Sequence, residues 1–261
     1  MKKGFILALL ALLVFSCSKD NDDDIIYENV STTFNFGHNW DGNKVTQDEF
    51  NSLQFNNANG ETMSIEKLRY LISNFTFNNV DGSTIEADGY VLVDVTNNTG
   101  LSITLDTEIP QGTYSNVSFT FGFNAEDNTD GTYPDLNSAS WNVPNTPMLG
   151  SVGGYHYMQL EGKFIDNMGA EVGYAYHAIR AADGSTTPPT IQETFIDVNM
   201  RNVTITNDVS FNIEMNIAEW FKNPNTWDLN ILNNMLMPNF DAQIMMNENG
   251  QNVFSLEDIT Q

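Results

Sequence analysis

Three histidines are the residues of this chain whose type is best suited to chemistry. His38 lies in Phe-Gly-His-Asn-Trp, His156 in Gly-Tyr-His-Tyr, and His177 in Ala-Tyr-His-Ala. Imidazole is the most common protein ligand for copper and zinc. None of the three has a second histidine at the spacing of a local metal motif, so a site would assemble from distant strands. Three unrelated structural histidines packed beside aromatic rings are the alternative interpretation.

Sulfur ligands are restricted to methionine in the folded part of the chain. Cys17 is the single cysteine, and there are 11 methionines. Thioethers suit Cu(I), and Met158, Met245 and Met246 lie nearest to the sequence motifs. Methionine is more often a packing residue than a ligand. We therefore expect a transition-metal site here to be built mainly from histidine.

A second metal interpretation concerns calcium. Residues 126–131 place oxygen-bearing side chains at alternate positions before a glycine, as calcium loops do. Asn137 occupies the position where such a loop needs a bidentate glutamate. A polar hairpin loop is therefore favoured over a calcium site.

The composition excludes several classes of function. The formal net charge of −24, from 34 acidic and 10 basic residues, argues against nucleic acid as a partner, since phosphate binding needs a basic stripe. The nucleophile elbow of hydrolases, the phosphate loop and the dinucleotide fingerprint are all missing from the sequence. We expect a binding protein rather than an enzyme, with a hydrolase as the remote alternative.

The first 30 residues predict export and attachment to a membrane. Lys2 and Lys3 precede an apolar run over residues 5–15, which is too short to span a bilayer but typical of a signal peptide. The run ends just before Cys17, in a segment that resembles the lipobox of bacterial lipoproteins. That resemblance implies a signal peptide over 1–16 and lipid on Cys17, with an ordinary signal peptide and a chance cysteine as the alternative.

Residues 17–30 form an acidic tether that cannot fold alone. A charged run behind a lipidated cysteine resembles the surface-export signals of Bacteroidota lipoproteins, and a plain spacer is the alternative. The expected location is the outer membrane, facing the periplasm or the cell surface. With one cysteine, an intramolecular disulfide is excluded.

Alternating apolar residues predict that residues 31–261 form one mainly β domain. Period-2 patterns appear at 34–36, 75–77, 91–95, 101–105, 117–123, 196–200, 203–205 and 209–217, separated by Gly, Asn and Pro turns. Short strands at steady spacing favour an antiparallel β-sandwich, immunoglobulin-like or similar. The few expected helices cover 48–53, 64–71 and 225–237.

Several segments in order resemble the MbnP-like domain family, which is named for the copper-binding partner protein of methanobactin operons. They are Leu-Arg-Tyr-Leu-Ile-Ser-Asn-Phe at 68–75, Ile-Pro-Gln-Gly-Thr-Tyr at 109–114, Asp-Leu-Asn at 135–137, Gly-Gly-Tyr-His-Tyr at 153–157, Glu-Gly at 161–162 and Tyr-His at 176–177. The resemblance covers about residues 31–256.

This resemblance implies an extracytoplasmic copper-binding protein that acquires or buffers copper. It implies His38, His156 and His177 as ligands, and Trp141 or Trp40 as the tryptophan that relatives oxidise to kynurenine through a partner di-haem peroxidase-like enzyme. A metal-free sandwich that binds carbohydrate or protein through Tyr133, Trp141 and Tyr155 is the alternative function.

Overall fold

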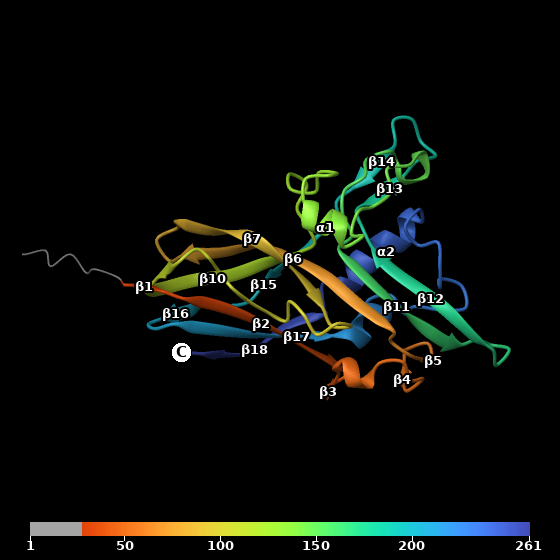
Figure 1. Cartoon of the computed structure of the whole chain (residues 1–261), viewed down its shortest axis with the longest axis horizontal. Helices are drawn as coiled ribbons and strands as arrows, with labels where there is room; N and C mark the ends of the chain where they lie inside the picture. The colour runs from red at the N-terminus through yellow and green to blue at the C-terminus, as the bar shows by residue number, and fades with distance from the viewer. Residues whose placement is uncertain (1–27) are drawn as a thin grey trace, which may run out of the picture.

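Two β-sheets that face each other form the body of the protein (Figure 1). The computed structural model describes residues 28–261. One sheet has nine strands and the other has five. The mainly β, sandwich-like fold with few short helices that the sequence predicts is confirmed.

The larger sheet contains the strands that lie under the candidate site. Its strands are β4 (Phe55–Asn56), β5 (Thr62–Met63), β6 (Lys67–Asn79), β7 (Thr84–Asp94), β10 (Gly112–Phe121), β11 (Met158–Ile165), β12 (Glu171–Ala178), β15 (Ile196–Asn199) and β16 (Val203–Ile205). The order β15-β10-β6-β11-β5-β4 runs across the sheet, and β7, β12 and β16 pair with β6, β11 and β10. Strand β6 is therefore central, with β7 on one side and both β10 and β11 along the other.

The smaller sheet closes the other side of the core. Its strands are β2 (Thr32–Trp40), β3 (Asn43–Lys44), β8 (Ser102–Thr104), β17 (Val209–Asn216) and β18 (Phe254–Thr260). Strands β2 and β17 run parallel, whereas every other strand pairing within residues 28–261 is antiparallel.

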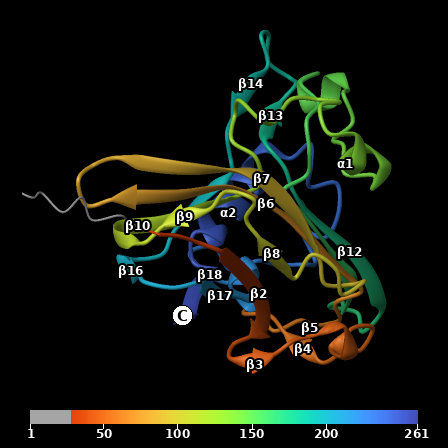
Figure 2. The same cartoon turned by 60° about the vertical axis from the view of Figure 1, so that its left-hand side comes forward.

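Short elements complete the described chain. Two-stranded ribbons join β1 (Asn29–Val30) to β9 (Ile109–Pro110) and β13 (Ala181–Asp183) to β14 (Thr190–Gln192). The helices are α1 (Pro134–Ser138) and α2 (Phe240–Gly250), with 3-10 turns η1 (Gln47–Glu49), η2 (Pro147–Leu149) and η3 (Ile217–Phe221). Figure 2 shows α1 and the β13–β14 ribbon together at one end of the molecule, with β3, β4 and β5 at the other.

Aromatic side chains fill the space between the sheets. Along β2, even-numbered residues are buried and odd-numbered ones are partly exposed, as expected when one face of a strand meets the core. The Phe34 ring lies 4.6 Å from Phe75 and 5.0 Å from Phe211, centroid to centroid. The alternation in sequence therefore predicts which face of this strand is inside.

A second, smaller apolar cluster covers the outer face of the larger sheet. It consists of Leu71, Phe123, Leu136, Trp141 and Tyr155. The chain between β10 and β11, which contains α1, supplies most of it. Strand β6 is therefore buried on both faces around Leu71.

This double burial explains why the helix expected over 64–71 is wrong. Leu68, Leu71 and Ile72 have the i, i+3, i+4 spacing of a helix face, yet all three belong to β6. Leu68 and Ile72 face the main core, whereas Leu71 packs in the outer cluster. A strand covered on both sides loses the alternation that would distinguish it from a helix.

The other two expected helices are largely absent. Over 48–53 the structure has only η1, where Thr46 and Glu49 form a capping box. Residues 225–237 form turns, in which Asp228 accepts a hydrogen bond from the Asn230 N–H at 2.8 Å. The helix begins after Pro238, with Asn239 as its N-cap.

The predicted signal peptide, Cys17 and residues 17–27 of the tether lie outside the described residues. The first strand begins at Asn29, slightly before the expected domain start at residue 31. Within residues 28–261, no helix has both the length and the apolar character needed to cross a membrane.

Candidate metal centre

His156 and His177 lie next to each other on the outer face of the larger sheet. His177 is in β12, where it pairs with Gln159 of β11, and His156 lies just before β11 begins. The centroids of the two imidazole rings are 5.3 Å apart, and the rings are nearly perpendicular. Twenty residues of intervening chain are folded into a hairpin that brings the two histidines together.

His156 is buried and keeps one nitrogen without a partner. Its side chain and backbone both bond to the carbonyl oxygen of Trp141, Nδ1 at 2.9 Å and the backbone N–H at 3.0 Å. A carbonyl oxygen only accepts, so Nδ1 carries the proton and Nε2 carries the lone pair. Nε2 is buried with no hydrogen-bond partner. A buried orphan acceptor costs free energy unless something binds it.

The charge state of His156 also suits a ligand. Burial lowers its pKa from 6.5 to about 4, opposed by the Trp141 hydrogen bond and supported by His177 and Arg69. The imidazole is therefore neutral at physiological pH, which is the form that binds metals.

His177 is bonded to a carboxylate. Its Nε2 lies 2.8 Å from Glu161 Oε1, and Lys67 Nζ bonds the same oxygen at 2.9 Å. The hydrogen bond from His177, and then that from Lys67, lower the pKa of Glu161 to about 2. The side chains of His177 and Glu161 are 17% and 31% exposed, so this side of the pair opens to solvent.

Trp141 lies against the histidine pair. Its ring centroid is 5.6 Å from that of His156, and the Arg69 guanidinium lies over its ring at 5.0 Å. Trp141 is fully buried, and its indole nitrogen has no hydrogen-bond partner. An antiparallel bridge between Asn142 and Tyr155 brings Trp141 to this position.

The expectation that His38 joins this pair is wrong. His38 lies on β2 in the smaller sheet, and its Nε2 bonds the Tyr70 hydroxyl at 2.9 Å in the main core. On β6, Tyr70 faces the core and the neighbouring Arg69 faces outward, because successive side chains alternate. Arg69 contacts Trp141 on the outer face. The larger sheet therefore separates His38 from His156 and His177.

Residues 29–243 of the chain match a family model described as MbnP. The chain belongs to the MbnP family. Among solved structures, MbnP from Methylosinus trichosporium is similar at 12% sequence identity, covering 71% of this chain and 76% of that chain with a TM-score of 0.43. No curated protein matches the chain. The family resemblance noted in the sequence is thus confirmed.

Trp40 is not part of the centre of this MbnP-family chain. It lies at the end of β2 in the main core, where its ring is tilted against Phe55 and stacked on Phe221. Its indole N–H donates to the Asn56 carbonyl at 3.3 Å. Of the two tryptophans expected beside the histidines, only Trp141 lies there.

Methionine sulfur does not extend the centre. Met158 is fully buried in the main core, on the face of β11 opposite to Gln159. Met246 is also a core residue, and Met245 packs against that core from α2. These three side chains act as packing residues in this fold.

The structure gives no support for a calcium loop at 126–131. The loop is built by Asn124, whose side chain accepts from the backbone N–H of Glu126 and Asp127 at 2.9 and 2.8 Å. Asn137 is engaged with Tyr155 and Asn142. Across residues 28–261, no group of three or more His, Cys, Asp or Glu side chains is spaced to hold a metal ion.

The histidine pair nevertheless fits an ion held by two imidazoles. A metal lies about 2.0–2.1 Å from an imidazole nitrogen, so two rings that share one ion have centroids at most about 6.4 Å apart. The observed 5.3 Å satisfies this limit. Glu161 is not counted as a third ligand, because its Oε1 is already bonded to His177 Nε2 and Lys67 Nζ.

Sequence reasoning did not assign to the site the residues that surround the pair, namely Lys67, Arg69, Gln159 and Glu161, although Arg69 and Glu161 lie in segments that resemble the MbnP-like family. A hairpin signal could have found Gln159 and Glu161, because Asp166 and Gly169 mark a tight turn between β11 and β12, whereas Lys67 and Arg69 lie on β6, whose pairing with β11 has no local signal. Counting outward from that turn places Gln159 opposite His177 and Glu161 diagonally beside it.

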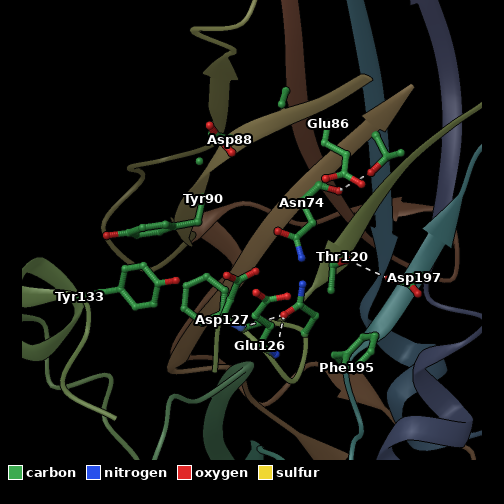
Figure 3. A pocket seen from close by; sticks show the side chains of 15 residues that line it. Asn74, Glu86, Asp88, Tyr90, Thr120, Glu126, Asp127, Tyr133, Phe195 and Asp197 are labelled. Carbon is green, nitrogen blue, oxygen red and sulfur yellow. Dashed lines mark hydrogen bonds between the residues drawn. The ribbon is translucent and has the colours of Figure 1, made fainter. Parts of the chain in front are cut away.

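A cavity of about 630 Å³ lies beside β6, β7 and β10, separate from the histidine pair (Figure 3). Its lining combines aromatic rings with carboxylates, namely Tyr90, Phe123, Tyr133 and Phe195 with Glu86, Asp88, Glu126, Asp127 and Asp197. Tyr133, one of the three aromatic residues expected to bind carbohydrate or protein in the metal-free alternative, lines this cavity. Trp141 and Tyr155, which the metal-free alternative also invoked as exposed aromatics, are fully buried.

Proposed function

We propose that this protein binds copper through His156 and His177 outside the cytoplasm, and that it acquires or buffers the metal rather than catalysing a reaction. The buried, unpartnered Nε2 of His156 carries this proposal. Burying this nitrogen away from water costs free energy unless its lone pair has a partner, and a metal ion shared with the neighbouring imidazole would be such a partner.

The donor set favours copper among the common metals. Two imidazoles suit copper, zinc, iron and nickel, and copper binds nitrogen donors most tightly among the divalent first-row ions. Carboxylate-binding metals such as calcium are disfavoured, since the nearest carboxylate, that of Glu161, is already bound to Lys67 and His177. The MbnP family resemblance points to the same metal.

The role of Trp141 is part of the proposal. Its ring lies 5.6 Å from that of His156, which makes it the tryptophan suited to become kynurenine and to complete the ligand set. A di-haem peroxidase-like enzyme is the proposed partner for this oxidation. Peptide mass spectrometry of protein from the native host tests it, and an unmodified Trp141 in copper-loaded protein contradicts this part.

Attachment through lipid on Cys17 would place the copper centre at the outer membrane. Support comes from the signal-peptide pattern and from the position of the single cysteine. Labelling cells with a palmitate analogue tests the anchor. We expect label on the native protein and none on Cys17→Ser, whereas label on both, or on neither, contradicts lipidation at this residue.

Copper analysis of the purified protein tests the central part of the proposal. We expect one copper ion per native chain and none after His156→Ala or His177→Ala. His38→Gln is the matched control, since glutamine can still bond the Tyr70 hydroxyl. Copper lost from His38→Gln in a folded protein, or none bound by the native chain, contradicts the proposal.

The cavity supports a second candidate function, carbohydrate binding. The stacked Phe123 and Tyr133 rings, with centroids 4.6 Å apart, lie among carboxylates that can accept hydrogen bonds from sugar hydroxyls. Calorimetry with cellohexaose and chitohexaose tests this function. Ile231, an exposed apolar residue outside the cavity lining, provides the control variant. Binding lost in Tyr133→Ala and kept in Ile231→Ala supports this function, and no binding by the native protein contradicts it.

A further inference from the structure

Glu161 contacts the histidine pair through the Nε2 atom of His177. Its Oε1 accepts from His177 Nε2 at 2.8 Å and from Lys67 Nζ at 2.9 Å. Lys67 and Glu161 are direct cross-strand partners of β6 and β11. His177 lies diagonally across the next strand pair, because Glu161 is opposite Ala175. Three adjacent strands therefore fix one chain of side chains, Lys67–Glu161–His177.

We infer that Glu161 is a positioning residue, which holds His177 with the proton on Nε2 so that Nδ1 is the nitrogen left for a metal. This inference rests on the proposed copper site. A carboxylate paired with lysine only accepts hydrogen bonds, so the His177 nitrogen that faces it must donate. In the neutral form of the ring, which is the form that binds a metal, the lone pair is then on Nδ1.

The two histidines thereby offer different nitrogens to one ion. The Trp141 carbonyl fixes the proton of His156 on Nδ1 and leaves Nε2 free. Glu161 fixes the proton of His177 on Nε2 and leaves Nδ1 free. Each acceptor selects the tautomer of its histidine and orients the ring, as outer partners of metal-binding histidines do.

The rest of β12 is held in place independently of Glu161. Gln243 of α2 is buried, donates to the His177 carbonyl at 2.9 Å and accepts from the Ile179 N–H at 2.8 Å. The backbone at His177 is therefore fixed from the helix side, and Glu161 acts on the ring alone. Removing the Glu161 side chain is expected to free the ring without moving the strand.

Nitrogen-15 NMR of the copper-free protein tests the inference directly. In the native chain we expect His177 with its proton on Nε2 and His156 with its proton on Nδ1. Glu161→Ala should leave His177 as a mixture of tautomers, while Glu161→Gln, whose amide oxygen still accepts, should keep the native tautomer. Glu171→Ala is the control, since Glu171 pairs with Lys163 at the far end of the same hairpin.

Copper affinity gives the second readout. Glu161→Ala should weaken copper binding by about 10- to 100-fold, Glu161→Gln less, and Glu171→Ala by less than about twofold. A native His177 protonated on Nδ1, a Glu161→Ala variant that keeps the native tautomer, or unchanged copper affinity in that variant overturns the inference. A native protein that shows the expected tautomers but binds no copper contradicts the proposed function instead.

Discussion

Two buried histidines, His38 of the smaller sheet and His156 on the outer face of the larger sheet, differ in whether the Nε2 atom has a hydrogen-bond partner. Burial lowers the pKa of both His38 and His156 to about 4. His38 Nε2 bonds the Tyr70 hydroxyl, whereas His156 Nε2 has no partner. Burial and a shifted pKa are therefore shared by a structural histidine and a candidate ligand. The unpartnered nitrogen beside a second imidazole is what distinguishes the candidate ligand.

The largest expected difference between His38 and His156 is in how much copper raises the free energy of unfolding. A ligand that binds only the folded state at about a thousand times its Kd adds about 4 kcal/mol to the free energy of unfolding. We expect this gain, measured by thermal unfolding with and without copper, in the native chain and in His38→Gln. His156→Ala should show none. An equal gain in all three proteins would remove the distinction.

Acid sensitivity should be the next largest effect and should be common to both regions. The unfolded chain protonates each histidine below pH 6.5, while the folded chain keeps it neutral down to about pH 4. Stability is thus full above pH 6.5 and is lost as the pH falls toward 4, by about 3 kcal/mol per histidine.

Guanidinium unfolding of copper-free protein between pH 7 and 4 measures this loss. His38→Gln and His156→Gln should each flatten the pH dependence by a similar amount, although only the second abolishes copper binding. A His38→Gln profile that matches the native one would show that His38 is not held neutral in the fold.

The smallest expected effect concerns the bond that makes His38 structural. Tyr70→Phe leaves His38 Nε2 buried without a partner, as His156 Nε2 is in the native chain. We expect a loss of about 1–2 kcal/mol in unfolding free energy and no change in bound copper. A loss of copper from folded Tyr70→Phe would mean that the core and the outer face are coupled.

The sequence predicts most of the sandwich because alternation along a strand is local. Each run such as that in β17 has one buried and one partly exposed face, and this is visible from a single segment. Strand β6 does not show this alternation around Leu71, because α1 and its flanking chain bury the outer face there. The residues that cover Leu71 lie 52 to 84 positions further along the chain, from Phe123 to Tyr155.

The candidate site could be predicted only in part for a related reason. Residue type singles out His38, His156 and His177 equally, and period-2 alternation does not say which sheet or which face each will occupy. The β11–β12 hairpin links His156 to His177 locally. The position of His38 depends on pairing between β2 and β17, which lie 177 residues apart, and that pairing has no local signature.

Anomalous diffraction from crystals of the copper-loaded protein tests the central claim most directly. The account predicts one strong peak at the copper edge, between the rings of His156 and His177 and within bonding distance of His156 Nε2. A peak beside His38, a peak elsewhere on the surface with the histidine pair empty, or no peak in protein shown to contain copper would contradict it.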